Sequence, residues 1–145
     1  MRTILFKAKK LSDGKWVKGS LVKTPFGTFI EWYEDSVCNK EEVDSSTVCQ
    51  FVGLTDCEGK ELFEHDLIHI VGFNYAAEVI WSEGSYAFMA VCENKHSYCL
   101  HSVIKACKIE IIGNKFDNKK YCMKEGKFDF SEALKRIRKG KLVKR

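Results

Sequence analysis

Proline and long apolar runs are scarce in this chain of 145 residues. Pro25 is its one proline, which excludes a proline-rich linker and a polyproline recognition segment. A run of about eighteen apolar residues, the length that a membrane-spanning helix needs, does not occur. The opening residues MRTILFKAKK lack the apolar stretch of a secretion signal. We therefore expect a soluble cytoplasmic protein without membrane attachment.

Residue patterns that carry catalysis are also missing. The chain has no glycine-rich phosphate loop, and its Ser-Ser-Thr run at 45–47 has no evident base beside it. Several carboxylates crowd one turn and its exit, and paired carboxylates can perform acid–base chemistry. Turns favour acidic residues for conformational reasons, so we interpret these as solvated charges and expect no enzyme. The crowded residues are Asp56, Glu58, Glu61, Glu64 and Asp66.

Cysteine, in contrast, is abundant, with seven residues. An odd number without a secretion signal predicts free thiols in a reducing compartment. The segment from Cys92 to His101 has the spacing C-x3-H-x2-C-x-H, and these residue types bind zinc. The spacing matches no common zinc knuckle, and alternate residues of a strand point to opposite faces. His65 and His69 span the end of the acidic turn and a strand, so they do not share one face as two residues with this spacing do in a helix. We favour core thiols and rim histidines, and expect no metal or cofactor.

Short segments with strand character follow one another, with tight turns between them. Ile4, Phe6 and Ala8 alternate with polar residues, and a polar turn then leads into a second strand. The polar stretch 39–46 is expected to be a loop, either irregular throughout or with one helical turn, and Asp66 is expected to accept backbone hydrogen bonds where a new strand begins. This succession predicts a mainly β fold, a curled antiparallel sheet or small barrel. The expected strands are 3–8, 16–22, 28–33, 47–52, 67–73, 76–81, 86–91 and 107–112.

Residues 119–145 differ from the rest of the chain in charge and period. They carry eleven basic and three acidic residues, a net charge of +8, whereas residues 1–118 have a net charge of −4. Phe130, Ala133, Leu134 and Ile137 fall on one face of a helix predicted at 130–139. A helix this short needs a surface to dock on, or it frays. Its basic residues can contact phosphates, although such runs are also typical of a solvated helix face. The candidate contacts are Lys135, Arg136, Arg138, Lys139, Lys141, Lys144 and Arg145.

Residues 1–118 resemble the YopX family of phage and prophage proteins. The resemblance rests on Arg2, Phe6, Ala8, Trp16, Gly19, Thr47, Gln50, Phe51, Gly53, Leu54, Asp56, Gly59, Lys60, Glu64, Asp66, Ile112, Gly113, Asn114 and Asp117. It implies an SH3-like small β-barrel at 47–118 preceded by additional N-terminal strands at 1–46. It also implies a prophage gene and the cytoplasm of a host bacterial cell. It implies no activity, because the family has no established molecular role.

The end of the chain has a second resemblance. Phe130, the run at 132–134, Gly140, Lys141, Val143 and Arg145 are similar to the opening of a small phage domain. That domain occurs in sponges that sequester cyclic-nucleotide signals of the Thoeris bacterial defence system. Residues 130–145 are either a vestige of such a domain or an ordinary capping helix.

These patterns favour a non-catalytic module that binds a protein partner or a second copy of itself. Barrel edges and exposed aromatic residues are suitable docking surfaces for added strands or helices. One alternative is a nucleic-acid-associated phage protein that uses the basic tail, and another is an anti-defence nucleotide sponge with a pocket shared between subunits. The candidate residues for partner binding surround the central turn: Gln50, Asp56, Lys60, Glu64 and Asp66.

Overall fold

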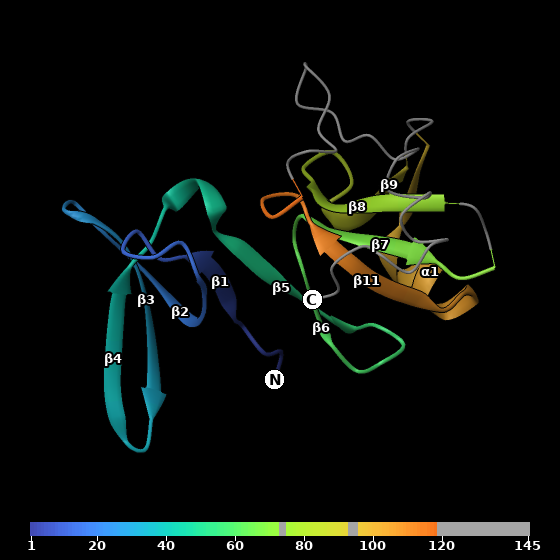
Figure 1. The fold of residues 1–145 in the computed structure, drawn as a ribbon. Coiled ribbons are helices and arrows are strands. Elements are labelled where there is room, and N and C mark those ends of the chain that lie inside the picture. Colours follow the sequence, from blue (N-terminus) through green and yellow to red (C-terminus); the bar gives the residue numbers. More distant parts are fainter. Residues whose placement is uncertain (73–74, 93–95, 119–145) are drawn as a thin grey trace. The chain divides into compact units, whose positions relative to one another are not determined.

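The structure, a computed structural model, describes residues 1–72, 75–92 and 96–118 (Figure 1). The predicted helix at 130–139 and the basic tail lie outside these residues. The described chain consists of antiparallel strands, a single turn of 3-10 helix and one short α-helix, so the predicted mainly β class is confirmed. Neither helix in this part of the chain is long and apolar enough to cross a membrane. The chain divides into two compact units, residues 1–53 and residues from 54 onward.

The first unit is an antiparallel sheet with the strand order β4-β3-β2-β1-β5. Its core consists of Ala8, Ile30 and Val43, against which half-buried apolar side chains pack. The alternation of apolar residues that predicted the first strands therefore corresponds to the side of the sheet that faces the core. The elements are β1 (Phe6–Lys9), β2 (Trp16–Thr24), β3 (Gly27–Glu34), β4 (Val37–Glu42), the 3-10 helix η1 (Ser45–Thr47) and β5 (Cys49–Thr55).

Strand β4 corrects the prediction of a loop at 39–46. Asp35 and Ser36 take positive φ angles of 51° and 65°, the geometry of a tight hairpin turn that reverses the chain directly after β3. Residues 37–42 then pair with β3 in a continuous register from Glu34 opposite Val37 to Phe29 opposite Glu42. An edge strand has one side in solvent, so its polar composition conceals its strand character from a search for apolar alternation.

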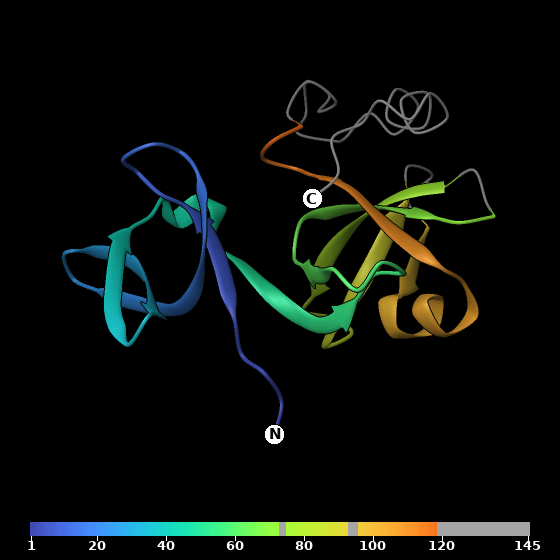
Figure 2. The same cartoon turned by 60° about the horizontal axis from the view of Figure 1, so that its bottom comes forward.

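The second unit contains a five-stranded antiparallel sheet in the order β10-β9-β8-β7-β11. The short strand β6 forms a hairpin with the end of β5, closed by a backbone hydrogen bond from Asp56 to Lys60. Helix α1 follows β10 and packs against β9 and β10, and its Leu100 is buried. Figure 2 shows the helix and the strands of this unit from a second side. The elements are β6 (Glu61–Phe63), β7 (Asp66–Ile70), β8 (Tyr75–Ser82), β9 (Ala87–Cys92), β10 (Ser97–Cys99), α1 (Leu100–Ala106) and β11 (Ile109–Asn114).

Strands β10 and β11 are the two ends of this sheet among the described residues, and no pairing joins them. The SH3-like barrel is therefore not confirmed, because the described strands form an open sheet. The last strand was expected at 107–112 and lies at Ile109–Asn114. Helix α1 was not predicted, because seven residues span barely two turns and give no clear helical period.

Candidate functional site

Asp56 organises the turn between β5 and β6. Its Oδ1 accepts hydrogen bonds from the backbone N–H groups of Glu58 and Lys60, each at 2.9 Å. Its Oδ2 accepts a third from the N–H of Ile111 in β11 at 3.2 Å, and Gly59 supplies the positive φ of 81° that the turn requires. Asp56 is only 6% exposed. The prediction of a solvated charge is therefore wrong for Asp56, whose carboxylate fastens the turn to the last strand.

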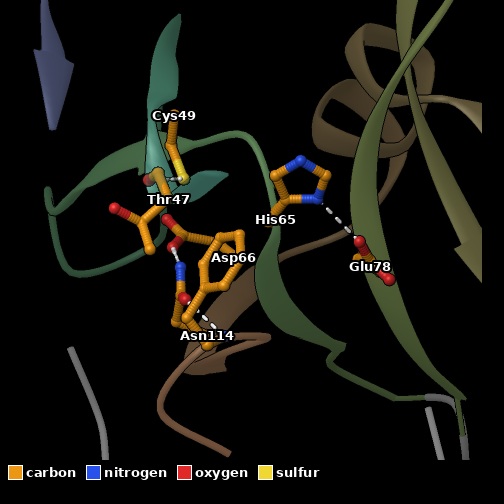
Figure 3. A network of polar contacts seen from close by, with 7 residues as sticks. Thr47, Cys49, His65, Asp66, Glu78 and Asn114 are labelled. Atoms are coloured by element: carbon orange, nitrogen blue, oxygen red, sulfur yellow. Dashed lines mark hydrogen bonds and ion pairs between the residues drawn. The ribbon is translucent and has the colours of Figure 1, made fainter. Parts of the chain in front are cut away.

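Asp66 begins β7 and is 1% exposed. Its Oδ2 accepts a hydrogen bond from the N–H of Phe63 at 2.8 Å, which confirms the prediction that it accepts backbone bonds at the start of this strand. Its Oδ1 accepts a bond from the side-chain Nδ2 of Asn114 at 3.0 Å (Figure 3). A buried carboxylate is stable when donors of this kind occupy its oxygens. Both oxygens of Asp66 thus serve the fold, and the interpretation as a solvated charge is wrong for Asp66 as well as for Asp56.

Asn114 is fully buried at the end of β11, and both Nδ2 and Oδ1 of its side chain form hydrogen bonds. Its Oδ1 accepts a bond from the N–H of Phe116 at 2.9 Å, and its own N–H donates to Oδ1 of Asn118 at 3.0 Å. The ladder shifts register between Ile111 and Gly113, where a side chain in place of the glycine hydrogen would collide with Asn118. The segment Ile112-Gly113-Asn114 therefore closes the second unit through backbone and amide contacts.

His65 lies at the corner between β6 and β7 in a left-handed conformation, with φ of 65°. Its N–H donates to the carbonyl of Val79 at 2.7 Å, and its carbonyl accepts from the N–H of Lys115 at 3.0 Å. Its Nδ1 lies 2.8 Å from Oε2 of Glu78 (Figure 3). The edge of its ring meets Phe116, with ring centres 5.6 Å apart. These contacts hold a backbone conformation that is otherwise unfavourable for a residue with a Cβ.

Thr47 has a comparable structural role in the first unit. Its Oγ1 accepts a bond from the N–H of Lys9 at 2.9 Å and donates to the carbonyl of Asp44 at 2.7 Å. Its own carbonyl accepts a bond from Sγ of Cys49 at 3.2 Å (Figure 3). Thr47 and Cys49 are both buried. Thr47 therefore joins the start of β5 to β1.

The residues proposed for partner binding divide into two groups. Asp56 and Asp66 are buried and their carboxylates are occupied by the contacts above. Gln50, Lys60 and Glu64 are half-buried, and the Nζ of Lys60 lies 3.2 Å from Oε2 of Glu58 in an exposed ion pair of little energetic weight. A role of these five residues in binding a partner stays a prediction.

The cysteine and histidine segment does not converge on one point. Cys92 is buried on β9, whereas Cys99 and His101 are exposed on β10 and α1. In residues 1–72, 75–92 and 96–118, no three His, Cys, Asp or Glu side chains are grouped closely enough to hold a metal ion. None of the six cysteines within these ranges forms a disulfide.

A pocket of about 440 Å³ lies beside α1, and the sequence did not indicate it. Its walls come from β7, β10, α1 and the residue after the helix, which are brought together only by the fold. The lining is mainly apolar, with one hydroxyl from serine, one from tyrosine and two thiols as its polar groups. The lining residues are Ile70, Tyr98, Cys99, Ser102, Val103, Ala106 and Cys107.

The charge around this pocket is opposite to that of its unit. Residues 54–118 carry ten acidic and five basic residues, but the stretch 96–109 has no acidic residue. It has two lysines, Lys105 and Lys108, and both are exposed. At the pocket itself, the backbone N–H of Ser102 donates to the sulfur of Cys99 and lowers the pKa of this thiol, against the opposing effect of burial. The pocket is thus mainly apolar inside, and the charged residues next to its lining residues Ala106 and Cys107 in the chain are Lys105 and Lys108.

The fold and the network of buried side-chain amides and carboxylates define a small, mainly β protein of two antiparallel units. Over residues 5–121, the chain matches the model of a protein family described as "YopX protein". The matched range covers most of the chain and includes both turns that Asp56 and Asn114 stabilise. The chain therefore belongs to the YopX family. No curated protein matches it.

Proposed function

We propose that this chain is a phage-type accessory protein that binds a protein partner in the cytoplasm without catalysing a reaction. Membership of the YopX family supports the phage-type assignment. The absence of catalysis is supported by the best-placed carboxylates, those of Asp56 and Asp66, whose oxygens are committed to backbone and amide donors. The observation that supports binding is the apolar pocket beside α1, which is lined in part by β10, an end strand of the sheet among the described residues.

Strand β10 is the end of its sheet, and its three residues Ser97–Cys99 are all exposed. An extended peptide can add to such an edge through backbone hydrogen bonds, while a neighbouring pocket selects one of its side chains. Tyr98 and Cys99 belong to this strand and also line the pocket. A peptide on β10 would therefore have the pocket directly beside it. The volume lies within the usual range for ligand pockets, roughly 300–1000 Å³.

The charges favour an acidic peptide with one large apolar residue. Lys105 belongs to the same helix as Ser102, Val103 and Ala106 of the pocket wall. Carboxylates on either side of the apolar residue would be attracted by Lys105 and Lys108 and would be repelled by the rest of this acidic unit. Complementary charge of this kind chiefly increases association rate and specificity.

A selection from a displayed library of random peptides tests this function on the full-length protein. We expect enriched sequences to contain Trp, Phe, Leu or Ile flanked by Asp or Glu. Ala106→Trp fills the pocket from an exposed helix position and should weaken binding of a selected peptide at least about tenfold. Glu83→Trp adds the same ring on an exposed turn and should leave binding unchanged. The absence of a consensus, or equal binding by the Ala106 variant, would contradict the proposal.

Nucleic-acid binding is a second candidate, supported by one face of the first unit's sheet. Lys7 lies opposite Lys18 in the register of β1 and β2, and Lys9 lies opposite Trp16. The Nζ atoms of Lys7 and Lys9 lie 4.8 and 5.5 Å from the centre of the Trp16 ring. Lys7 is buried, so Lys9 and Lys18 are the lysines of this face that can attract phosphates, and affinity would then fall as salt increases.

Fluorescence anisotropy with labelled single-stranded DNA tests this candidate at low and high salt. Lys18→Glu should reduce the affinity and flatten its dependence on salt, because one phosphate contact is removed. Lys23→Glu makes the same charge change on the opposite face of β2, where residues alternate. Equal effects of the two substitutions would favour a general charge effect over a defined face.

A further inference from the structure

The backbone N–H and C=O groups of β4 point alternately toward β3 and toward the outer edge of the sheet, and the structure shows which residues point to each side. The N–H of Val43 donates to the carbonyl of Thr28 at 2.9 Å, which marks this pair as one whose backbone groups face each other. Every second residue of an antiparallel ladder has this orientation, so the odd-numbered residues of β4 bond to β3. The backbone N–H and C=O groups of Cys38 and Lys40 consequently point away from β3, toward the outside of the sheet.

Glu42 confirms that the even-numbered residues of β4 point outward, because its carbonyl accepts the N–H of Leu11 at 3.1 Å. That bond covers the last residue of β4. In the part of the chain that the structure describes, no strand pairs with β4 on the outer side of Cys38 and Lys40. Large apolar side chains lie next to this open stretch, with Val37 60% and Tyr33 72% exposed. Exposed sheet edges of this type are templates for an added strand.

We propose that β4 pairs with β4 of a second copy of this chain, antiparallel and about a two-fold axis at Asn39. In this register, Cys38 of each copy faces Lys40 of the other. All outward backbone groups of these two residues then find partners, which gives four hydrogen bonds between the copies. Asn39 faces Asn39, and Val37 faces Glu41. No like charges are opposed.

The charges of β4 disfavour the neighbouring registers. An axis at Lys40 would place two lysines directly opposite each other, which destabilises a cross-strand pair. An axis at Cys38 would place Lys40 opposite Ser36, which belongs to the hairpin turn and has a φ of 65°. The outward bonds of Lys40 would then have no strand to pair with. Lys40 thus selects one register, whereas an uncharged edge would allow several.

This pairing goes beyond the proposed peptide binding, because it concerns a different unit and does not involve the pocket. A single strand of six residues makes a small interface, so we expect a reversible dimer in the micromolar range. Pairing would cover Val37 and the Cys38 side chain. It would leave the pocket beside α1 unaltered in composition, so the two proposals can fail separately.

Sedimentation equilibrium of the full-length protein tests the dimer, with two substitutions at one position. Lys40→Pro removes an outward N–H that β3 does not use, and should raise the dimer dissociation constant at least about tenfold. Lys40→Thr removes the same charge and the contact of Nζ with the Phe29 ring, 4.7 Å from its centre, but keeps the N–H. It should leave the constant within about threefold. A monomeric wild type, or equal effects of both substitutions, would overturn the inference.

Disulfide trapping tests the register independently of whether the proline variant folds. Facing residues that lack mutual hydrogen bonds have Cα atoms about 4.5 Å apart, within reach of a disulfide. Asn39→Cys in a Cys38→Ser background should therefore give a cross-linked dimer with a 39–39 linkage by peptide mass spectrometry. Glu41→Cys in the same background places the two thiols about 13 Å apart and should not cross-link. Equal cross-linking at both positions, or none at Asn39→Cys, would refute the register. Ala106→Trp should dimerise as the wild type does.

Discussion

Oδ1 of Asp66 and Nδ2 of Asn114 lie 3.0 Å apart and join the first residue of β7 to the last residue of β11. The two residues are also partners in the strand register. The hydrogen bond between their side chains thus links, at the end of the ladder, the same two strands that the backbone pairing links along it. Both residues are almost completely buried, so water cannot replace either partner.

Replacing Asp66 should destabilise the protein strongly. Asp66→Ala removes the acceptor of the Phe63 N–H and of the Asn114 amide and leaves two buried donors unsatisfied. We expect the free energy of unfolding to fall by about 2–4 kcal/mol. Urea denaturation followed by far-UV circular dichroism measures it. Glu83→Ala on an exposed turn should change it by less than about 0.5 kcal/mol, and similar losses in both variants would contradict the assigned role of Asp66.

Two glycines give a matched test of the closing segment. Gly113→Ala places a methyl group against the Asn118 side chain, whose Oδ1 accepts the Asn114 N–H. The methyl group must displace the Asn118 side chain or be strained against it, so we expect the free energy of unfolding to fall by about 1–3 kcal/mol. Gly84→Ala makes the same change where nothing lies within 4 Å of the added atom. Its stability should stay within about 0.5 kcal/mol of the wild type. A thermal or urea denaturation series that fails to separate the variants would refute the close contact.

Two exposed thiols should react at different pH. The backbone N–H of Ser102 lowers the pKa of Cys99, whereas the Glu31 carboxylate, which accepts the thiol hydrogen of Cys38 with Sγ and Oε1 3.2 Å apart, raises the pKa of Cys38. The thiolate is the reactive form, so alkylation of Cys99 should reach half its maximal rate at the lower pH. Pulses of iodoacetamide across a pH series, read by peptide mass spectrometry, measure both sites in one sample.

The variant Glu31→Gln tests whether the Glu31 carboxylate causes the difference in pH between the alkylation of Cys38 and that of Cys99. It removes the negative charge beside Cys38 and should move the alkylation profile of Cys38 to lower pH. The profile of Cys99 should not change, because Glu31 is not among the groups that shift its pKa. Coincident wild-type profiles at the two cysteines would disprove the assignment.

The hairpin turn before β4 should become more stable with glycine. Ser36 has a φ of 65°, a conformation that costs residues with a Cβ and that glycine adopts freely. Ser36→Gly should therefore raise the free energy of unfolding by roughly 0.5–1 kcal/mol. Ser85→Gly, in a turn where serine does not have a positive φ, should not stabilise. A loss of stability in the Ser36 variant would show that the serine has a contact that outweighs its backbone strain.

The sequence predicted elements whose signal is local. The alternation in β2 and β3 and the polar turns between strands identified most of the first unit, and the quoted turn residues identified the YopX family. Asp66 was assigned its backbone role because an acidic residue at a strand start is a recurrent local arrangement.

The features that the sequence did not predict depend on contacts between residues that are distant in the sequence, on the position of a strand at a sheet edge, or on an element too short to show a period. Asp56 was placed in solvent because its third donor, the Ile111 N–H, lies 55 residues away. The pocket needs Ile70 and Ala106 to meet, and no local pattern encodes that meeting. Strand β4 is polar because one of its sides is an edge, and α1 is too short for a helical period.

The long connection from Asp56 to Ile111 has a consequence for the newly made chain. When residue 56 has been synthesised, all strands of the first unit already exist, so that unit can fold early. The second unit must wait for β11, because both Asp56 and β7 need it as a partner. At about 5–20 residues per second, the wait is roughly 3–11 seconds. During it, the apolar residues of β7 remain without their final cover, and the nascent chain is most exposed to chaperones and to aggregation.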